Sequence, residues 1–131
     1  MTDPIIEIRN LRKVFKIGEV DVEALRGVNL DVPRGQFLAV VGPSGSGKST
    51  MFNILGGLAK PTSGSVRIDG KDLSHMTDNE RNDLRKKFVG FVFQKYNLLP
   101  TLTARDNIEI ARAIAKLDKP NNDPWFEEAL E

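Results

Sequence analysis

The chain has 131 residues, 40% of them apolar, which is enough for one modest domain and too few for two. Lys and Arg number 19 against 18 Asp and Glu, so the net charge is +1, a balance that argues against a general nucleic-acid or anionic-membrane binder. The lack of cysteine excludes disulfides and thiolate metal sites, a single histidine is too few for a metal cluster, and no apolar run approaches the ~18 residues that span a bilayer. Because the N-terminus also lacks a basic and apolar signal sequence, we expect a soluble, cytosolic, globular protein.

Three segments near the start of the chain have strand patterns. Apolar and polar residues alternate over residues 5–10 and again over 28–32, which predicts two half-buried strands. Pro33-Arg34-Gly35 predicts the turn after the second of them. Phe37–Val41 is continuously apolar between glycines, the pattern of a strand buried on both faces in a parallel sheet.

The period then becomes helical. Four apolar residues over 50–58 fall on one helix face: Met51, Ile54, Leu55 and Leu58. A turn at 61–64 and a short strand at 65–69 follow, and Asp69-Gly70 closes that strand.

Two capping-box patterns predict helix starts further along the chain. Thr77-x-x-Glu80 opens a helix to about Lys87, and we expect the charges of this region to form a solvated face. Residues 88–93 predict a second buried strand. Thr103-x-x-Asp106 has Asp where the capping box usually has Glu, and it starts a further helix.

A phosphate-binding loop is predicted between the buried strand and the first helix, where Gly42–Ser49 fits the pattern G-x-x-x-x-G-K-[ST]. Glycines bring backbone N–H groups onto phosphate oxygens without a Cβ in the way, and the helix adds its positive N-terminal end. Lys48 supplies a charge for the β- and γ-phosphates, and the Ser49 hydroxyl supplies a ligand for Mg²⁺. The alternative is an ordinary glycine-serine loop between a strand and a helix.

Around this loop the chain resembles the nucleotide-binding domain of ATP-binding-cassette (ABC) transporters, from about Ile5 to Ala115. The matching segments are Ala24–Leu30, Gly42–Thr50, Pro61–Gly64, Ile68–Gly70, Gly90–Gln94, Asn97–Pro100 and Leu102-Thr103. Within the family, Gly18–Leu25 and Asn53–Leu58 are most similar to the branch that serves lipoprotein release and macrolide export.

The resemblance implies an α/β fold of the P-loop NTPase class, with a partial core sheet, an antiparallel β-subdomain and the start of a helical subdomain. Residues 1–131 would form the amino-terminal part of one ATP-binding domain. The residues it implies for ATP binding are Phe15, Gly42, Ser44, Gly45, Ser46, Gly47, Lys48, Ser49 and Thr50. It assigns catalytic roles to Lys48 and Gln94, and Mg²⁺ ligation to Ser49 and Gln94.

Two of these assignments have open alternatives. The family stacks an aromatic residue on adenine at the position of Phe15, which would otherwise be a core residue of the β-subdomain. Gln94 matches the Q-loop glutamine, which relays the nucleotide state to the membrane partner, and would otherwise be a polar residue that closes a strand.

The resemblance also implies partners. Tyr96, Leu98 and Leu99 lie in a loop and would form a contact for a transmembrane permease, unless they pack locally on the following helix. A second ATP-binding subunit would complete a dimer, nucleic acid is not an expected partner, and the complex would lie on the inner face of the cell membrane. Substrate choice would belong to the permease.

Several family motifs are absent from these residues: the LSGGQ-like signature, the Walker B strand with its catalytic Glu, and the switch histidine. His75 precedes the Q-loop and does not match that histidine by position. We therefore expect the chain to bind Mg-ATP without hydrolysing it, and the remaining strands of the core sheet to follow Glu131. A non-catalytic nucleotide-binding module remains open, whereas a GTPase is disfavoured because no Asn-Lys-x-Asp motif occurs.

Overall fold

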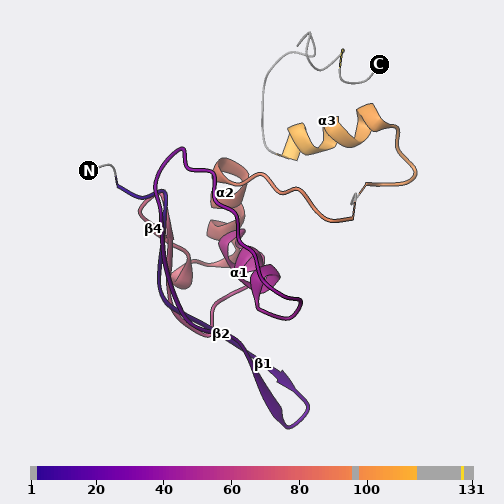
Figure 1. Cartoon of the computed structure of the whole chain (residues 1–131). Coiled ribbons are helices and arrows are strands. Elements are labelled where there is room, and N and C mark those ends of the chain that lie inside the picture. Colours follow the sequence, from indigo (N-terminus) through magenta and orange to yellow (C-terminus); the bar gives the residue numbers. More distant parts are fainter. Residues whose placement is uncertain (1–2, 96–97, 115–127, 129–131) are drawn as a thin grey trace. The chain divides into compact units, whose positions relative to one another are not determined.

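The computed structural model describes residues 3–95, 98–114 and 128 of the chain (Figure 1). These residues belong to two compact units, Met1–Arg85 and Lys86–Glu131. The first unit holds a four-stranded sheet, helix α1 (Lys48–Leu55), the short 3₁₀ helix η1 (Leu73–His75) and most of helix α2 (Asp78–Phe88). The described part of the second unit holds the last residues of α2, the segment after it and helix α3 (Ala104–Ile114).

The sheet is antiparallel throughout, with the strand order β2-β1-β3-β4. Its strands are β1 (Ile6–Ile17), β2 (Val20–Val32), β3 (Ser63–Ile68) and β4 (Lys71–Asp72). It corresponds to the predicted antiparallel β-subdomain. β1 and β2 run well beyond the predicted segments because they form one long hairpin, whose far end extends away from the helices (Figure 1).

A bulge in β1 explains why the alternating pattern stops at Asn10. This residue has a left-handed backbone with φ of 46°, and the pairing register of β1 with both neighbours shifts beside it. Its N–H donates to the side-chain oxygen of Asn29 at 2.9 Å. A Cβ on Gly64 would lie 2.3 Å from the Asn10 carbonyl oxygen, so the neighbouring strand needs a glycine there.

The core lies between the sheet and helices α1 (Lys48–Leu55) and α2 (Asp78–Phe88), which Figure 1 shows on one side of the sheet. Its buried apolar residues are Ile8, Leu11, Leu25, Val32, Met51, Ile54, Val66, Ile68, Leu73 and Leu84. Met51 and Ile54 are buried as the helical period predicts. Leu58 is not, because the helix ends before Gly56 and Gly57, and Leu58 is 48% exposed.

Both capping boxes are confirmed. The Thr77 hydroxyl donates to Glu80 at 2.8 Å and accepts from the Glu80 N–H at 3.3 Å. Thr103 and Asp106 make the same reciprocal pair, at 2.7 and 3.1 Å. Each pair satisfies backbone donors that a helix start otherwise leaves without partners.

The solvated helix face predicted for the charged region is wrong at one residue. Arg81 is only 7% exposed, and its guanidinium donates to the Met76 carbonyl at 3.1 Å and to the Asp78 carboxylate. Its aliphatic stem therefore covers apolar surface while its charge is paired.

The two predicted buried strands are also wrong. Phe37–Val41 has no regular structure, and Phe37 and Val41 are 94% and 87% exposed. α2 continues to Phe88, and residues 89–93 are likewise irregular, with Val92 99% exposed. A strand is fixed by hydrogen bonds to a neighbouring strand, and the described residues supply no neighbour for either segment.

Candidate functional site: the phosphate-binding loop

The predicted phosphate-binding loop leads into the N-terminus of α1. Two of its glycines have a left-handed backbone, Gly45 with φ of 80° and Gly47 with φ of 92°. Nothing lies within 4 Å of a Cβ built on Gly45, so this glycine is needed for conformation alone. A Cβ on Gly47 would lie 2.4 Å from the carbonyl oxygen of Ala24, in β2, so here a side chain is also excluded by space.

The first turn of α1 keeps backbone donors available for a ligand. Its first helical hydrogen bond runs from the Met51 N–H to the Gly47 carbonyl at 2.9 Å. The N–H groups before Met51 have no acceptor within the helix, and no side chain caps them because the N-cap residue is glycine. Such a helix start favours an anion through these donors and through the helix dipole.

Lys48 lies over the loop that precedes it. Its ammonium donates to the carbonyl oxygens of Gly42 at 2.6 Å and Pro43 at 2.7 Å, and to the Ser46 hydroxyl at 3.1 Å. These bonds fold the side chain back on its own loop and keep its positive charge beside the backbone donors of α1.

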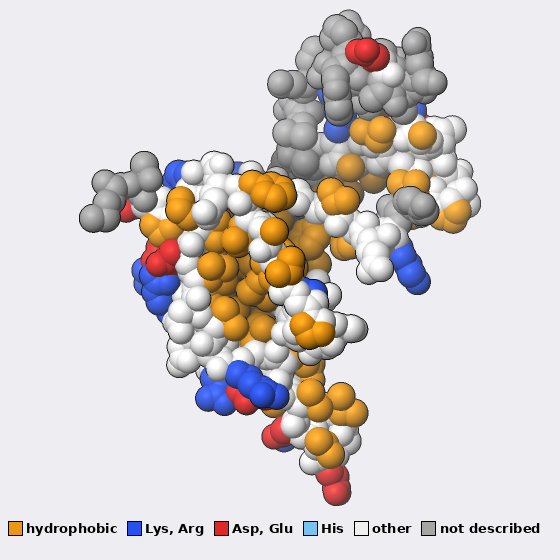
Figure 2. Space-filling model, in the orientation of Figure 1, with side chains coloured by type: hydrophobic (Ala, Val, Ile, Leu, Met, Phe, Trp, Pro, Cys, Tyr) orange, Lys and Arg blue, Asp and Glu red, His pale blue; other side chains and the backbone are white. Residues whose placement is uncertain are grey.

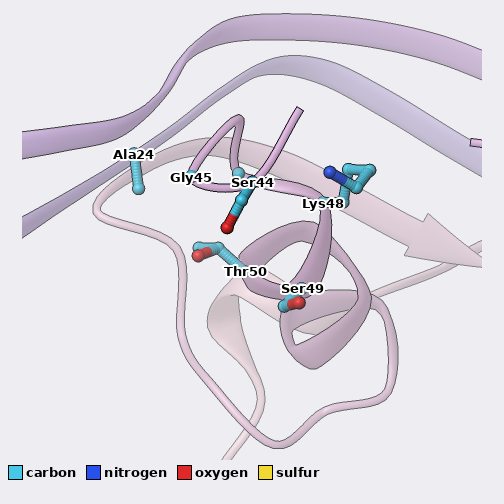
Figure 3. Close-up of a pocket in the computed structure, with 7 residues that line it drawn as sticks. Ala24, Ser44, Gly45, Lys48, Ser49 and Thr50 are labelled. Atoms are coloured by element: carbon cyan, nitrogen blue, oxygen red, sulfur yellow. The ribbon is translucent and has the colours of Figure 1, made fainter. Parts of the chain in front are cut away.

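An open pocket of about 440 Å³ lies at this helix start (Figure 3). It is lined by Ala24, Ser44, Gly45, Gly47, Lys48, Ser49 and Thr50. Three of these side chains carry hydroxyls and one carries a positive charge, and no carboxylate is among them. The chemistry of the lining therefore fits a polyanion of phosphate groups.

The lining also fits a magnesium ion brought in with phosphates. The Ser49 hydroxyl belongs to the first turn of α1 and is exposed (Figure 3). Mg²⁺ takes few protein ligands and completes its octahedron with water and phosphate oxygens. Within residues 3–95, 98–114 and 128, no group of three His, Cys, Asp or Glu side chains forms a metal site of its own.

Six of the predicted site residues line this pocket, whereas Gly42 and Ser46 belong to the loop without lining it, and Phe15 is not among the lining residues. It lies on β1 opposite Val22, is 42% exposed, and has the Lys13 ammonium 5.1 Å from its ring centroid. The alternative role as a core residue is therefore wrong, and the ring is accessible on the hairpin.

The remaining predicted residues belong to the second unit. Gln94 is exposed in an irregular segment that follows Phe93. Leu98 and Leu99 are 61% and 50% exposed, as expected for a contact surface. Tyr96 lies outside the described residues.

Sequence reasoning missed Ala24 as a pocket residue. The Ala24 carbonyl and the side chain of its neighbour Leu25 both lie beside Gly47, so this part of β2 borders the loop, and Figure 3 shows Ala24 next to it. No signal in the sequence shows that β2 and the loop approach each other, because this contact joins residues more than 20 positions apart.

None of the described helices is long and apolar enough to cross a membrane.

A glycine-rich loop that opens a helix, with lysine and serine in the first turn, defines a P-loop nucleotide-binding protein. The sequence pattern of the ABC transporter family matches residues 25–131, and the chain belongs to this family. Its fold is an α/β P-loop NTPase fold, present in part.

Similar proteins agree with this assignment. An uncharacterized ABC transporter ATP-binding protein of Thermotoga maritima is 44% identical over 127 residues, which are 97% of this chain and 54% of that protein. The macrolide export ATP-binding/permease protein MacB of Syntrophobacter fumaroxidans is 49% identical over 104 residues, 79% of this chain and 14% of that protein. The solved dimer of the ATP-binding cassette MJ0796 bound to ADP and Pi has a TM-score of 0.85 and 41% identity, over 95% of this chain and 54% of that one. The chain thus spans about half the length of the ATP-binding relatives it matches.

Proposed function

We propose that the chain is the amino-terminal part of one ATP-binding domain of an export-type ABC transporter, and that it binds Mg-ATP at the phosphate-binding loop. The observation that carries the proposal is the pocket at the start of α1, where uncapped backbone donors and the Lys48 ammonium surround space for phosphates. The similarity to a cassette solved with ADP and Pi supports the same ligand class.

The residues of the phosphate-binding loop have different roles, which follow from their chemistry. Backbone N–H groups of Ser44, Gly45 and Gly47, which line the pocket together with Thr50, bind the phosphates. Gly42 and Ser46 belong to the same loop, and the Ser46 N–H would have to leave the Pro43 carbonyl, to which it donates at 3.2 Å, in order to join them. Lys48 leaves its loop carbonyls and donates to the β- and γ-phosphates.

Three further roles complete the nucleotide site. Ser49 donates its hydroxyl oxygen to Mg²⁺. Phe15 offers an accessible aromatic face to adenine. Under this proposal Gln94, which belongs to the second unit, has the Q-loop role: it would be a ligand for Mg²⁺ or the attacking water and would relay the nucleotide state to the membrane partner.

The partners follow from the same proposal. A transmembrane permease docks on the segment that contains Tyr96, Leu98 and Leu99, and a second ATP-binding subunit completes a dimer. The name of MacB joins ATP-binding and permease functions in one protein, and the MJ0796 cassette was solved as a dimer; both support this arrangement. The working place of the subunit is then the cytoplasmic face of the membrane.

A second candidate function is a nucleotide-binding module that does not hydrolyse ATP. The 131 residues hold no LSGGQ-like segment and no Walker B carboxylate. Phosphoryl transfer depends on positioning and charge stabilisation, and the groups for the metal and the attacking water are incomplete in this chain. We therefore expect binding of Mg-ATP without turnover by the chain alone.

Thermal melts with and without Mg-ATP test the proposal, together with a phosphate-release assay. A ligand at ~100 times its dissociation constant adds ~2.7 kcal/mol to the folded state, so the melting temperature of the wild type rises. Lys48→Ala removes the main positive charge on the phosphates and abolishes that rise. Lys16→Ala, an exposed lysine outside the pocket lining, is the matched control and keeps it.

Two results would contradict the proposal. An unchanged wild-type melt at saturating Mg-ATP would exclude nucleotide binding. Steady turnover that Lys48→Ala eliminates would show that the chain alone is a complete ATPase.

A further inference from the structure

The side chain of Asn107, in the first turns of α3, makes four hydrogen bonds to the backbone of the segment before the helix. Its Oδ1 accepts from the Leu99 N–H at 2.8 Å. Its Nδ2 donates to the carbonyl oxygens of Leu99 at 3.2 Å, Leu102 at 3.3 Å and Thr103 at 2.9 Å. One amide group therefore uses its acceptor and both its donors on a single loop.

These bonds hold both ends of a tight turn. The Leu102 N–H donates to the Leu99 carbonyl at 3.1 Å, which closes a turn with Pro100 in the position that its fixed φ favours. Asn107 binds the first residue of this turn through its N–H and its carbonyl, and the last residue through its carbonyl. The turn is thereby held by a side chain of α3 as well as by its own backbone hydrogen bond.

Two large apolar side chains stand at the beginning of this turn. Leu98 and Leu99 are 61% and 50% exposed, so packing within the described part of the second unit does not fix them. The backbone of Leu99 is fixed instead by the amide of Asn107, which accepts from the Leu99 N–H and donates to the Leu99 carbonyl. Leu98 directly precedes this fixed residue in the chain. Exposed leucines on an ordered backbone lose less conformational entropy on binding than leucines on a free loop.

We propose that Asn107 is a positioning residue, which holds Leu98 and Leu99 in a preformed arrangement for the permease. This inference rests on the proposed function in one respect, because the proposed function identifies the partner as a permease. The positioning role itself concerns only the loop and α3, so it is tested without a partner and without nucleotide.

The chain has no cysteine, so a single introduced thiol can carry a spin label at a chosen position. Leu98→Cys places a label on the turn, and Glu109→Cys places one on α3 itself. In the parent chain we expect a restricted electron paramagnetic resonance spectrum at both positions, recorded on the full 131-residue chain.

Asn107→Ala removes all four side-chain bonds, and Asn107→Asp keeps the acceptor for Leu99 but loses every donor. In both variants we expect the ratio of mobile to restricted label at Leu98→Cys to rise at least about fivefold, because the loss of a single net hydrogen bond already gives that factor and each variant loses more than one. The label at Glu109→Cys should stay restricted, because the Thr103–Asp106 capping box still holds the helix start. Asn82→Ala is the matched control, since this helical asparagine accepts from the Arg85 side chain in α2, and it should leave both spectra unchanged.

An unchanged label at Leu98→Cys in both Asn107 variants would overturn the positioning role. Equal mobilisation at Glu109→Cys would also overturn it, because Asn107 would then stabilise the helix as a whole. Neither result affects the comparison of wild-type and Lys48→Ala melts with Mg-ATP. A failure of this inference is therefore distinguishable from a failure of the proposed function.

Discussion

The carbonyl oxygen of Ala24 lies beside Gly47, only 2.4 Å from the position that the Cβ of any other residue would take there. The contact joins the hairpin to the phosphate-binding loop through backbone atoms, which a rotamer change cannot relieve. Gly47 also has a positive φ, so two independent reasons exclude a side chain at this position.

Gly47→Ala should therefore be far more damaging than Gly45→Ala. Both glycines have a positive φ, which costs a non-glycine residue roughly 1–2 kcal/mol, but only Gly47 faces a backbone atom. We expect Gly47→Ala to abolish the rise in melting temperature with Mg-ATP, and Gly45→Ala to keep part of it. Equal behaviour of the two variants in paired melts would show that the Ala24 contact has no influence on the loop.

The surface made by Leu98 and Leu99 gives a second prediction. In a subunit completed to the length of its relatives, Leu98→Ser combined with Leu99→Ser should reduce co-purification with the permease. Binding of Mg-ATP should persist, because these side chains are absent from the lining of the phosphate pocket. The measurement is pull-down yield beside a nucleotide melt, and a double variant that still recovers the permease normally would rule out this surface.

The exposed apolar segments predict the stability of the chain on its own. Phe37, Val41 and Val92 are almost fully exposed, and Figure 2 shows further apolar side chains at the surface of the first unit. Unpaired apolar backbone and exposed patches promote association. We expect aggregation or a low, weakly cooperative melt by calorimetry. A sharp two-state transition of a monomer above about 60 °C, the top of the usual mesophile range, would contradict this.

The capping box of α3 predicts a pH dependence. Hydrogen bonds from the Thr103 hydroxyl and N–H hold the pKa of Asp106 below its ordinary value. Because the folded pKa is the lower one, the carboxylate's contribution is fully present above the ordinary pKa of Asp. It is lost as the pH falls through the folded value.

Thr103→Val should raise the pKa of Asp106 toward its ordinary value, and Thr103→Ser should leave it low. The measurement is a titration of the carboxyl carbon by nuclear magnetic resonance. Hydrogen bonds from Thr77 also lower the pKa of Glu80, which serves as the internal control and should not respond to either substitution. If Asp106 had the same pKa in Thr103→Val as in the wild type, the Thr103 hydroxyl would not be the cause of its lowered pKa.

How much of this structure follows from the sequence depends on the range of the interactions involved. The capping boxes at Thr77 and Thr103 involve residues within a few positions of one another, and both were predicted correctly. The helix after the phosphate-binding loop was also predicted, but over residues 50–58, whereas it spans Lys48–Leu55. The prediction of a strand at Phe37–Val41 is wrong. Apolar composition shows only that a segment can be buried, whereas a strand also needs a neighbouring strand to pair with.

The same distinction applies within the site. The loop residues from Gly42 to Thr50 follow from a contiguous motif whose spacing carries the chemistry. Ala24 and the amide bonds of Asn107 do not, because each depends on the approach of two segments that only the folded chain brings together. The polar partners of Arg81 lie within five positions of it, but its Cβ also lies beside Gly57, which only the folded chain brings near.

The strand order also governs how the chain folds as it is synthesised. β1 and β2 are consecutive and pair along most of their length around a turn at Gly18, so they close a small loop, and contacts of this kind form quickly. A lone hairpin is marginally stable, and β3 supplies the third strand after the phosphate-binding loop has left the ribosome. The hairpin and β3 together hold β2 in place, so the Ala24 carbonyl against which Gly47 packs becomes fixed only when this third strand pairs with β1.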